Sequence, residues 1–322
     1  DLDRAVGALA LLALMSGLVA AQTTDPVETI RVDSDLVDLK VSVVSLTPKK
    51  PLDELQQKDF VVLEDGQRQD ISFFAAADAP FDLVLLLDLS GSSNDKLKLI
   101  RKSAKRFVEA TRPMDRVSIV GFTDVAVLVC PMTQDRQQLT KAIDHIQQPH
   151  GGTKFWDSLR YVLAILNASN NPSRRSAVVV MTDGVDNAIP EVFGDGSETT
   201  FEELTQIVKS SDAMVFPIYL DTEEEEFKRH RTPRSAFEIA RYQLAQLASA
   251  SATHLYWANK LSDLDDVYRQ VIGDLGRVYS IGYRPSNTMK DGKWRSVTVQ
   301  IQERSDLAAR TKSGYFSKSE AN

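Results

Sequence analysis

Short apolar runs alternate with amphipathic helical segments from residue 81 to residue 275, and this alternation restricts the possible folds more than any other feature. Leu83 to Leu87 is a continuous apolar run, short enough for a strand that is buried on both faces. Such runs, separated by helical segments, predict an α/β fold with helices on both faces of a doubly wound, mostly parallel six-stranded sheet. The predicted strands are residues 84–87, 117–122, 125–129, 177–181, 214–220 and 254–257.

One pair of these runs is joined by a very short connection. The run at 125–129 follows the run at 117–122 almost directly, so we expect the two strands to pair antiparallel. The predicted helices cover about residues 95–110, 134–147, 201–211, 235–249 and 261–275, and a further one after the loop at 150–153 contains Leu159, Val162, Leu163 and Leu166.

Strand-like segments also lie on both sides of this region. Residues 30–78 hold three apolar runs, and Glu64-Asp65-Gly66 after the second is a typical hairpin turn. Residues 277–317 hold further predicted strands, at 278–283, at 295–302 with a clear alternation, and at 309–316. Neither segment has enough strands for a core of its own. We therefore predict one small β-sandwich-like domain formed by both segments, with an α/β domain, residues 79–276, inserted between them.

The first residues are typical of an export signal. Arg4 precedes an apolar stretch, and small residues precede a cleavage position after Ala21, so residues 1–21 are predicted to be a signal peptide. An uncleaved membrane anchor is the alternative, but the apolar stretch is short for a spanning helix. Residues 22–29 are predicted to be a linker and 318–322 a tail. We expect an exported protein that is periplasmic, bound to the cell envelope or secreted.

Charge and cysteine content exclude some functions. The net charge is −7, without a block of Lys and Arg, which argues against nucleic-acid binding. Cys130 is the only cysteine. An internal disulfide is therefore excluded, and the apolar neighbours of Cys130 predict a buried structural thiol.

Oxygen-bearing side chains follow the predicted strands at three places. Asp88, Ser90 and Ser92 follow the first strand at steps of two, Thr153 follows two glycines, and Asp183 follows a buried strand. Because ligands bind at the carboxyl edge of a doubly wound sheet, we expect these five residues to converge there. Two carboxylates and three hydroxyls suit a hard cation, Mg²⁺ first, with Mn²⁺ or Ca²⁺ as alternatives, rather than zinc.

The charge of this ligand set suggests a mechanism. Two carboxylates only neutralise a dication. If the hydroxyls bind directly and the carboxylates through water, the cation stays electrophilic and accepts an Asp or Glu carboxylate from a partner protein as its last ligand.

The three motifs together resemble a known site. Asp-x-Ser-x-Ser at 88–92, Gly-Gly-Thr at 151–153 and Thr-Asp-Gly at 182–184 resemble the metal-ion-dependent adhesion site of von Willebrand factor type A domains. The resemblance covers about residues 81–275 and implies a Rossmann-like fold. It also implies direct ligation by the two serines and Thr153, with the two aspartates acting largely through water.

The whole chain is also similar to a bacterial family of exported proteins in which β segments flank a type A domain. The similarity lies in Val-Leu-Glu-Asp-Gly at 62–66, Gly-Tyr-Arg-Pro at 282–285 and Gly-Tyr-Phe at 314–316. We therefore predict a metal-dependent protein-binding module of the adhesion or scaffold type, and not an enzyme.

Two alternatives are of a different class. A magnesium-dependent hydrolase or phosphatase would use Asp88 as a nucleophile, but Ser90 stands where a second aspartate is expected. The sequence also lacks a nucleophile elbow and a phosphate-binding glycine loop. In the other alternative the β domain docks the partner and the metal only stabilises loops.

Other polar residues are predicted to have ordinary roles. The alternative for the 88–92 segment is a capped turn that binds no metal. Asp186 and Asn187 are predicted to be solvated loop residues, and Asp124 a turn residue. The four acids at 223–226 are predicted to form a solvated loop.

Overall fold

The computed structural model describes residues 36–45, 54–75, 79–91, 97–147, 150–168, 171, 174–228 and 232–319. The predicted signal peptide, the predicted linker and Ser92 lie outside these ranges. Within them, no helix combines the length and the apolar character that a membrane crossing requires.

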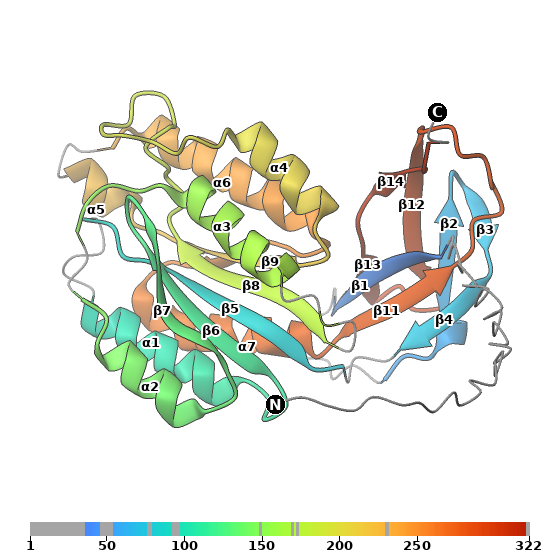
Figure 1. Cartoon of the computed structure of the whole chain (residues 1–322), viewed down its shortest axis with the longest axis horizontal. Helices are drawn as coiled ribbons and strands as arrows, with labels where there is room; N and C mark the ends of the chain where they lie inside the picture. Colours follow the sequence, from blue (N-terminus) through green and yellow to red (C-terminus); the bar gives the residue numbers. More distant parts are fainter. Residues whose placement is uncertain are drawn as a thin grey trace, which may run out of the picture. The chain divides into compact units, whose positions relative to one another are not determined.

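A six-stranded sheet lies at the centre of the α/β part, in the order β10-β9-β8-β5-β6-β7 (Figure 1). All neighbours are parallel except β6 and β7, which pair antiparallel as expected from their short connection. The predicted fold class is therefore confirmed. The strands are β5 (Phe81–Asp88), β6 (Arg116–Phe122), β7 (Ala126–Thr133), β8 (Arg175–Thr182), β9 (Met214–Leu220) and β10 (Tyr256–Ala258).

Helices cover both faces of this sheet. Successive side chains of a strand point to opposite faces, so the continuous apolar run of β5 supplies two cores. Leu83 and Leu85 belong to one core and Val84 and Leu86 to the other. The first core is closed by α1 (Leu97–Ala110), α2 (Arg136–Asp144) and α7 (Leu264–Leu275), and the second by α3 (Phe155–Ala168), α4 (Phe201–Ser210) and α6 (Arg234–Ala250). Cys130 is buried in the first core, as predicted.

The flanking segments form two four-stranded sheets, in the orders β13-β1-β11-β4 and β14-β12-β2-β3. Each sheet combines strands from before and after the α/β part, and apolar side chains of both sheets form one core. The first sheet contains β1 (Val37–Ser45), β4 (Ile71–Ala75), β11 (Val278–Tyr283) and β13 (Leu307–Arg310). The second contains β2 (Phe60–Glu64), β3 (Gln67–Gln69), β12 (Trp294–Ile301) and β14 (Gly314–Phe316).

The three flanking motifs of the sequence meet at one buried carboxylate. Glu64 is 2% exposed and accepts hydrogen bonds from Tyr283 Oη at 2.7 Å and Tyr315 Oη at 2.8 Å. Burial and the neighbouring Glu64 raise the pKa of both phenols well above the usual range. The predicted turn at Asp65-Gly66 is also present, with both residues at positive φ, the geometry of a type I′ hairpin.

One segment differs from the prediction. The acidic run at 223–226 does not form a solvated loop but a short helix, α5 (Glu223–Lys228). Its acids pair with two arginines of α6, and Glu226 is buried. A local charge pattern does not reveal partners that lie further along the chain.

Candidate metal centre

The loops that follow β5, β6 and the predicted Gly-Gly turn are held together by backbone hydrogen bonds. Leu89 N donates to Phe122 O at 2.9 Å, and Leu89 O accepts from His150 N at 3.0 Å. Gly91 N then donates to Gly151 O at 3.1 Å. These bonds fix the segment after Asp88 against the segment that precedes Thr153, two parts of the chain that the sequence places far apart.

Asp88 ends β5, and both oxygens of its carboxylate accept hydrogen bonds. The residue is 3% exposed. Its Oδ1 accepts from Ser90 N at 3.0 Å, and its Oδ2 accepts from Thr182 Oγ1 at 2.6 Å. The same Thr182 hydroxyl accepts from Gly184 N at 2.9 Å. Thr182 therefore fixes Asp88 on β5 relative to the loop after β8, and the predicted Thr-Asp-Gly motif supplies a positioning residue as well as Asp183.

Asp124 holds the glycine pair in front of Thr153. Its carboxylate, in the turn between β6 and β7, accepts from Gly152 N with both oxygens at 3.1 Å. Gly151 has φ +85°, and a Cβ there would lie 2.4 Å from Asp124 Oδ2. Only glycine tolerates both the backbone angle and this close approach. Asp124 is thus a turn residue, as predicted, but one that also shapes the loop leading to Thr153.

Asp183 is a buried carboxylate whose pKa is strongly perturbed. It is 7% exposed, and its carboxylate accepts from Val185 N at 3.1 Å and Thr222 Oγ1 at 2.7 Å. Burial first, then the charge of Asp88 and, least, the charge of Glu226 raise the pKa of Asp183 to about 7, against the hydrogen bonds from Thr222 and Val185. Two carboxylates that oppose each other's ionisation in a buried place form a favourable site for a cation.

Asp186 is not the solvated residue that we predicted. It is fully buried, and its carboxylate accepts from Trp156 N at 3.0 Å, Ala188 N at 2.8 Å and Ser197 N at 3.0 Å. It also accepts from Ser197 Oγ at 2.6 Å. Four donors bound to one carboxylate make Asp186 the support of the loop after Asp183, and its backbone partners could not be read from local sequence.

Thr153 and Asp183 line one cavity of about 530 Å³ at this edge of the sheet, together with Gly91, Gly151 and Glu226. Ser90 directly precedes Gly91 and is 2% exposed. Four of the five predicted ligands, Asp88, Ser90, Thr153 and Asp183, therefore gather at the same edge; Ser92 lies outside the described ranges.

These residues fit a hard cation. The donors are all oxygen atoms, as magnesium requires, and a dication would remove the repulsion that raises the pKa of Asp183. The described part of the chain contains no group of three or more His, Cys, Asp or Glu side chains arranged for a metal. A cation here would accordingly depend on the hydroxyls as well as on the carboxylates.

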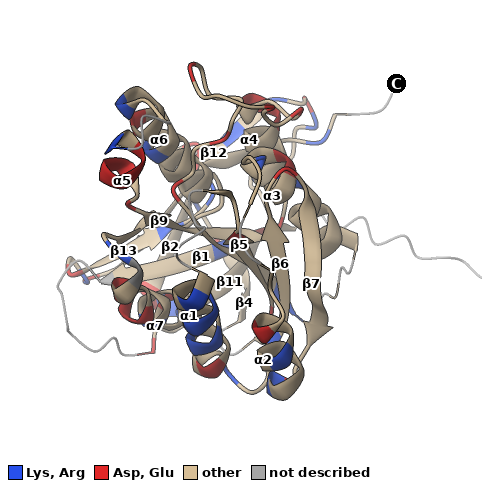
Figure 2. Cartoon of the chain, turned by 90° about the vertical axis from the view of Figure 1, so that its left-hand side faces the viewer, with Lys and Arg blue, Asp and Glu red and all other residues tan. Residues whose placement is uncertain are grey.

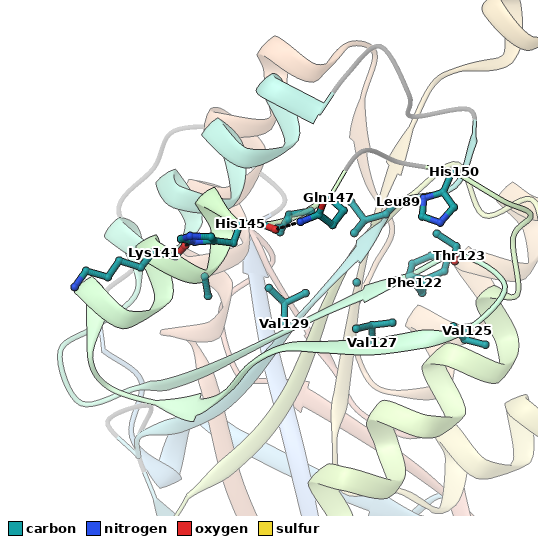
Figure 3. Close-up of a pocket in the computed structure, with 13 residues that line it drawn as sticks. Leu89, Phe122, Thr123, Val125, Val127, Val129, Lys141, His145, Gln147 and His150 are labelled. Atoms are coloured by element: carbon teal, nitrogen blue, oxygen red, sulfur yellow. Dashed lines mark hydrogen bonds between the residues drawn. The ribbon is translucent and has the colours of Figure 1, made fainter.

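An apolar groove is lined by residues of the same two loops (Figure 3). Leu89, next to Asp88, and His150, next to Gly151, stand toward one end, while Lys141 of α2 and His145, just after α2, stand at the other. The groove has a volume of about 510 Å³. Along it lie Val127 and Val129 of β7, the edge strand of the sheet, and Val125, which directly precedes β7 and is 63% exposed.

Comparison with known proteins identifies the α/β part. Residues 83–185 match the family model described as the von Willebrand factor type A domain. The chain contains a von Willebrand factor type A domain. The match includes Asp88, Ser90, Ser92, Thr153 and Asp183, and it agrees with the sheet order and helical layers described above.

Individual relatives are distant. An uncharacterized protein of Borreliella burgdorferi is 25% identical over 157 residues, which are 46% of this chain and 43% of that protein. A UPF0353 protein of Mycolicibacterium paratuberculosis is 22% identical over 205 residues, 60% of this chain and 61% of that protein. The chain thus spans less than two thirds of either relative. Among solved structures, a von Willebrand factor type A protein from Catenulispora acidiphila has 14% identity and a TM-score of 0.48, covering 83% of this chain and 76% of that one.

Proposed function

We propose that this protein is an exported, metal-dependent protein-binding module of the adhesion or scaffold type, and not an enzyme. A divalent cation, Mg²⁺ first, binds at the sheet edge to Asp88, Ser90, Ser92, Thr153 and Asp183. An Asp or Glu side chain of a partner protein provides the last ligand. The observation that carries this proposal is the shared cavity of Thr153 and Asp183, at the edge where Asp88 ends β5 and Ser90 follows it.

The residues of the chain have distinct roles in this function. The hydroxyls contact the cation without adding charge, so the cation remains able to attract an outside carboxylate. The two aspartates neutralise it, and Thr182 and Thr222 fix the carboxylates by donating hydrogen bonds of 2.6 and 2.7 Å. The bound cation supplies Lewis acidity toward the partner's carboxylate.

The apolar groove supports a protein rather than a small acid as the partner. Exposed apolar side chains beside a polar site are typical of protein-binding surfaces. Because Leu89 and His150 border the groove while their neighbours Gly91 and Gly151 border the cavity, one partner segment can contact both.

The test is titration of the purified chain with Mg²⁺ by calorimetry after removal of metal with EDTA. We expect one site in the wild type, and Asp88→Asn should abolish it while keeping the shape of the side chain. Asp266→Asn, which changes an exposed acid on α7 (side chain 71% exposed), is the matched control and should bind like the wild type.

Two results would contradict the proposal. If Asp88→Asn still binds magnesium, the cation does not bind at this edge of the sheet. Metal-dependent turnover of phosphatase or esterase substrates that Asp88→Asn removes would favour the enzyme alternative.

A second experiment identifies the acidic partner. It captures partners from cell-envelope extract in Mg²⁺, and the partner is the captured protein that is lost in EDTA.

A further inference from the structure

A third buried carboxylate faces the cavity from an unexpected element. Glu226 of α5 is 4% exposed and lines the cavity together with Thr153 and Asp183. Its neighbours Glu224 and Glu225 on the same short helix are exposed. Figure 2 shows α5 as an acidic helix. Of the four consecutive acids, the fold therefore turns one toward the predicted metal centre.

Two arginines of α6 clamp α5 in this position. Arg234 Nη1 donates to Glu223 Oε1 at 2.8 Å, and Arg241 Nη1 donates to Glu223 Oε2 at 2.8 Å. Arg234 also donates to Glu224 at 3.0 Å, and its guanidinium lies 4.3 Å from the centre of the Phe227 ring. The hydrogen bond from Arg241, followed by that from Arg234, holds the pKa of Glu223 below its usual range against the effect of burial. The clamp stays charged at neutral pH and fixes where Glu226 points.

The carboxylate of Glu226 lines the same cavity as the predicted ligands Asp183 and Thr153, so its negative charge lies at the predicted metal centre. Bringing a further carboxylate to a buried edge that already holds two costs free energy, and a bound dication offsets that cost. The described residues hold no trio of acidic side chains spaced as metal ligands, so Glu226 acts across the cavity through its charge and through water.

We propose that Glu226 is a further determinant of cation binding at this site, held in place by the clamp of Arg234 and Arg241 on α5. The inference rests on the proposed function, because it assumes a cation at the sheet edge. The inference gives the acidic helix α5 a role. The charge of Glu226 strengthens the attraction for a dication, while Glu226 replaces neither the hydroxyl ligands nor the partner's carboxylate at the last coordination position.

The experiment compares Mg²⁺ affinity by calorimetry in the full chain and three variants of α5. Glu226→Gln should bind Mg²⁺ about tenfold more weakly than the wild type. Glu225→Gln, which removes the same charge from an exposed position of the same helix, should leave the affinity unchanged. Glu226→Asp should restore most of the loss. Urea unfolding of each metal-free variant, measured alongside, should show similar stabilities for Glu226→Gln and wild type, which a purely structural role would not produce.

The outcomes separate the two proposals. A wild type that binds no Mg²⁺ overturns the proposed function together with this inference. A wild type that binds Mg²⁺, with equal affinities for Glu226→Gln and Glu225→Gln, overturns the role of Glu226 alone. If Glu226→Gln fails to fold, Arg241→Gln provides the test, because it loosens α5 without altering an acid near the cavity. It should then bind Mg²⁺ several-fold more weakly, and an unchanged affinity would overturn the inference.

Discussion

Thr182 shows how much of the site depends on residues that do not touch a cation. Its hydroxyl donates a hydrogen bond to Asp88 Oδ2 and accepts one from Gly184 N. One buried side chain therefore positions both the end of β5 and the turn after Asp183. Threonine at this place is therefore a hydrogen-bonding requirement of the loop and not only a β-branched strand residue.

Replacing Thr182 with valine tests this role. Thr182→Val keeps the shape but leaves two buried partners unsatisfied, so the free energy of unfolding should fall by about 1–3 kcal/mol. Magnesium affinity should fall about tenfold, because Asp88 loses the donor that orients it. Urea unfolding and Mg²⁺ calorimetry measure the two effects. Thr182→Ser keeps the hydroxyl and should retain the affinity; equal losses in both variants would contradict a hydrogen-bonding role.

The location of the predicted ligands at the sheet edge was readable from the sequence, but their supports were not. Asp88 and Asp183 follow strands whose apolar pattern is local, and Thr153 stands at a helix start, so their place at the sheet edge could be inferred. Asp186 and Glu226 are also polar loop or helix residues, yet both are buried. Their burial depends on Trp156 and Ser197 in one case and on Arg234 and Arg241 in the other. Such distant partners leave no local pattern.

At the scale of elements, ion pairs align the start of the central strands. Asp82 on β5 is 2% exposed and stands directly opposite Arg116 on β6. Arg116 Nε donates to Asp82 Oδ1 at 2.8 Å, and Arg174, just before β8, donates to the same oxygen at 2.5 Å. Burial would raise the pKa of Asp82, but the hydrogen bonds from Arg116 and Arg174 outweigh it and hold the pKa below 3.8.

Asp82→Asn should destabilise the protein in a pH-dependent way. At pH 7 the loss should be about 3 kcal/mol, because two arginines lose a buried partner. Since the pKa of Asp82 is lowered in the folded state, its contribution is present above 3.8 and lost as pH falls through the lower folded value. The difference between variant and wild type should therefore narrow in acid. Urea unfolding from pH 7 to pH 3 measures it, and a difference that stays constant would refute this assignment.

Elements with a strong local pattern were predicted closely. The strands at 214–220 and 278–283 have the predicted bounds, because β-branched and aromatic runs end at turn residues there. The prediction treated residues 309–316 as one further strand, whereas the structure has two short ones, β13 and β14, that belong to different sheets. The bounds of a short strand and the sheet that it joins depend on the strands with which it pairs, and a local sequence pattern does not show those strands.

At the scale of the whole molecule, two cations, Arg175 and the half-buried Lys312, connect the type A domain to the flanking sheets. Arg175 at the start of β8 is 5% exposed; it donates to Val278 O and, at 3.3 Å, to Ser280 Oγ on β11. Lys312 donates to Lys209 O at 2.8 Å and to Ser211 O, at the end of α4. Each part thus donates a side-chain hydrogen bond to backbone carbonyls of the other: Arg175 of the type A domain to β11, and Lys312 of the flanking segment to the end of α4.

Arg175→Met should weaken this connection while keeping the apolar stem of the side chain. We expect a loss of about 2 kcal/mol in unfolding free energy, since hydrogen bonds from a charged donor are lost in a buried place. Amide hydrogen exchange should become faster in β11 and in its neighbour β1. Arg106→Met, at an exposed position of α1, is the control. Unchanged protection of β11 in Arg175→Met would show that the guanidinium does not join the two parts.

The mixed origin of the two flanking sheets has a consequence for synthesis. Tyr283 and Glu64, which meet in the finished molecule, are separated by 219 residues of chain. While the ribosome is still translating the type A domain, β1 and β4 lack β11, the strand that joins them. Their unpaired edges and apolar faces invite aggregation until the last strands emerge. Both sheets can therefore close only after the strands from β11 to β14 have been translated.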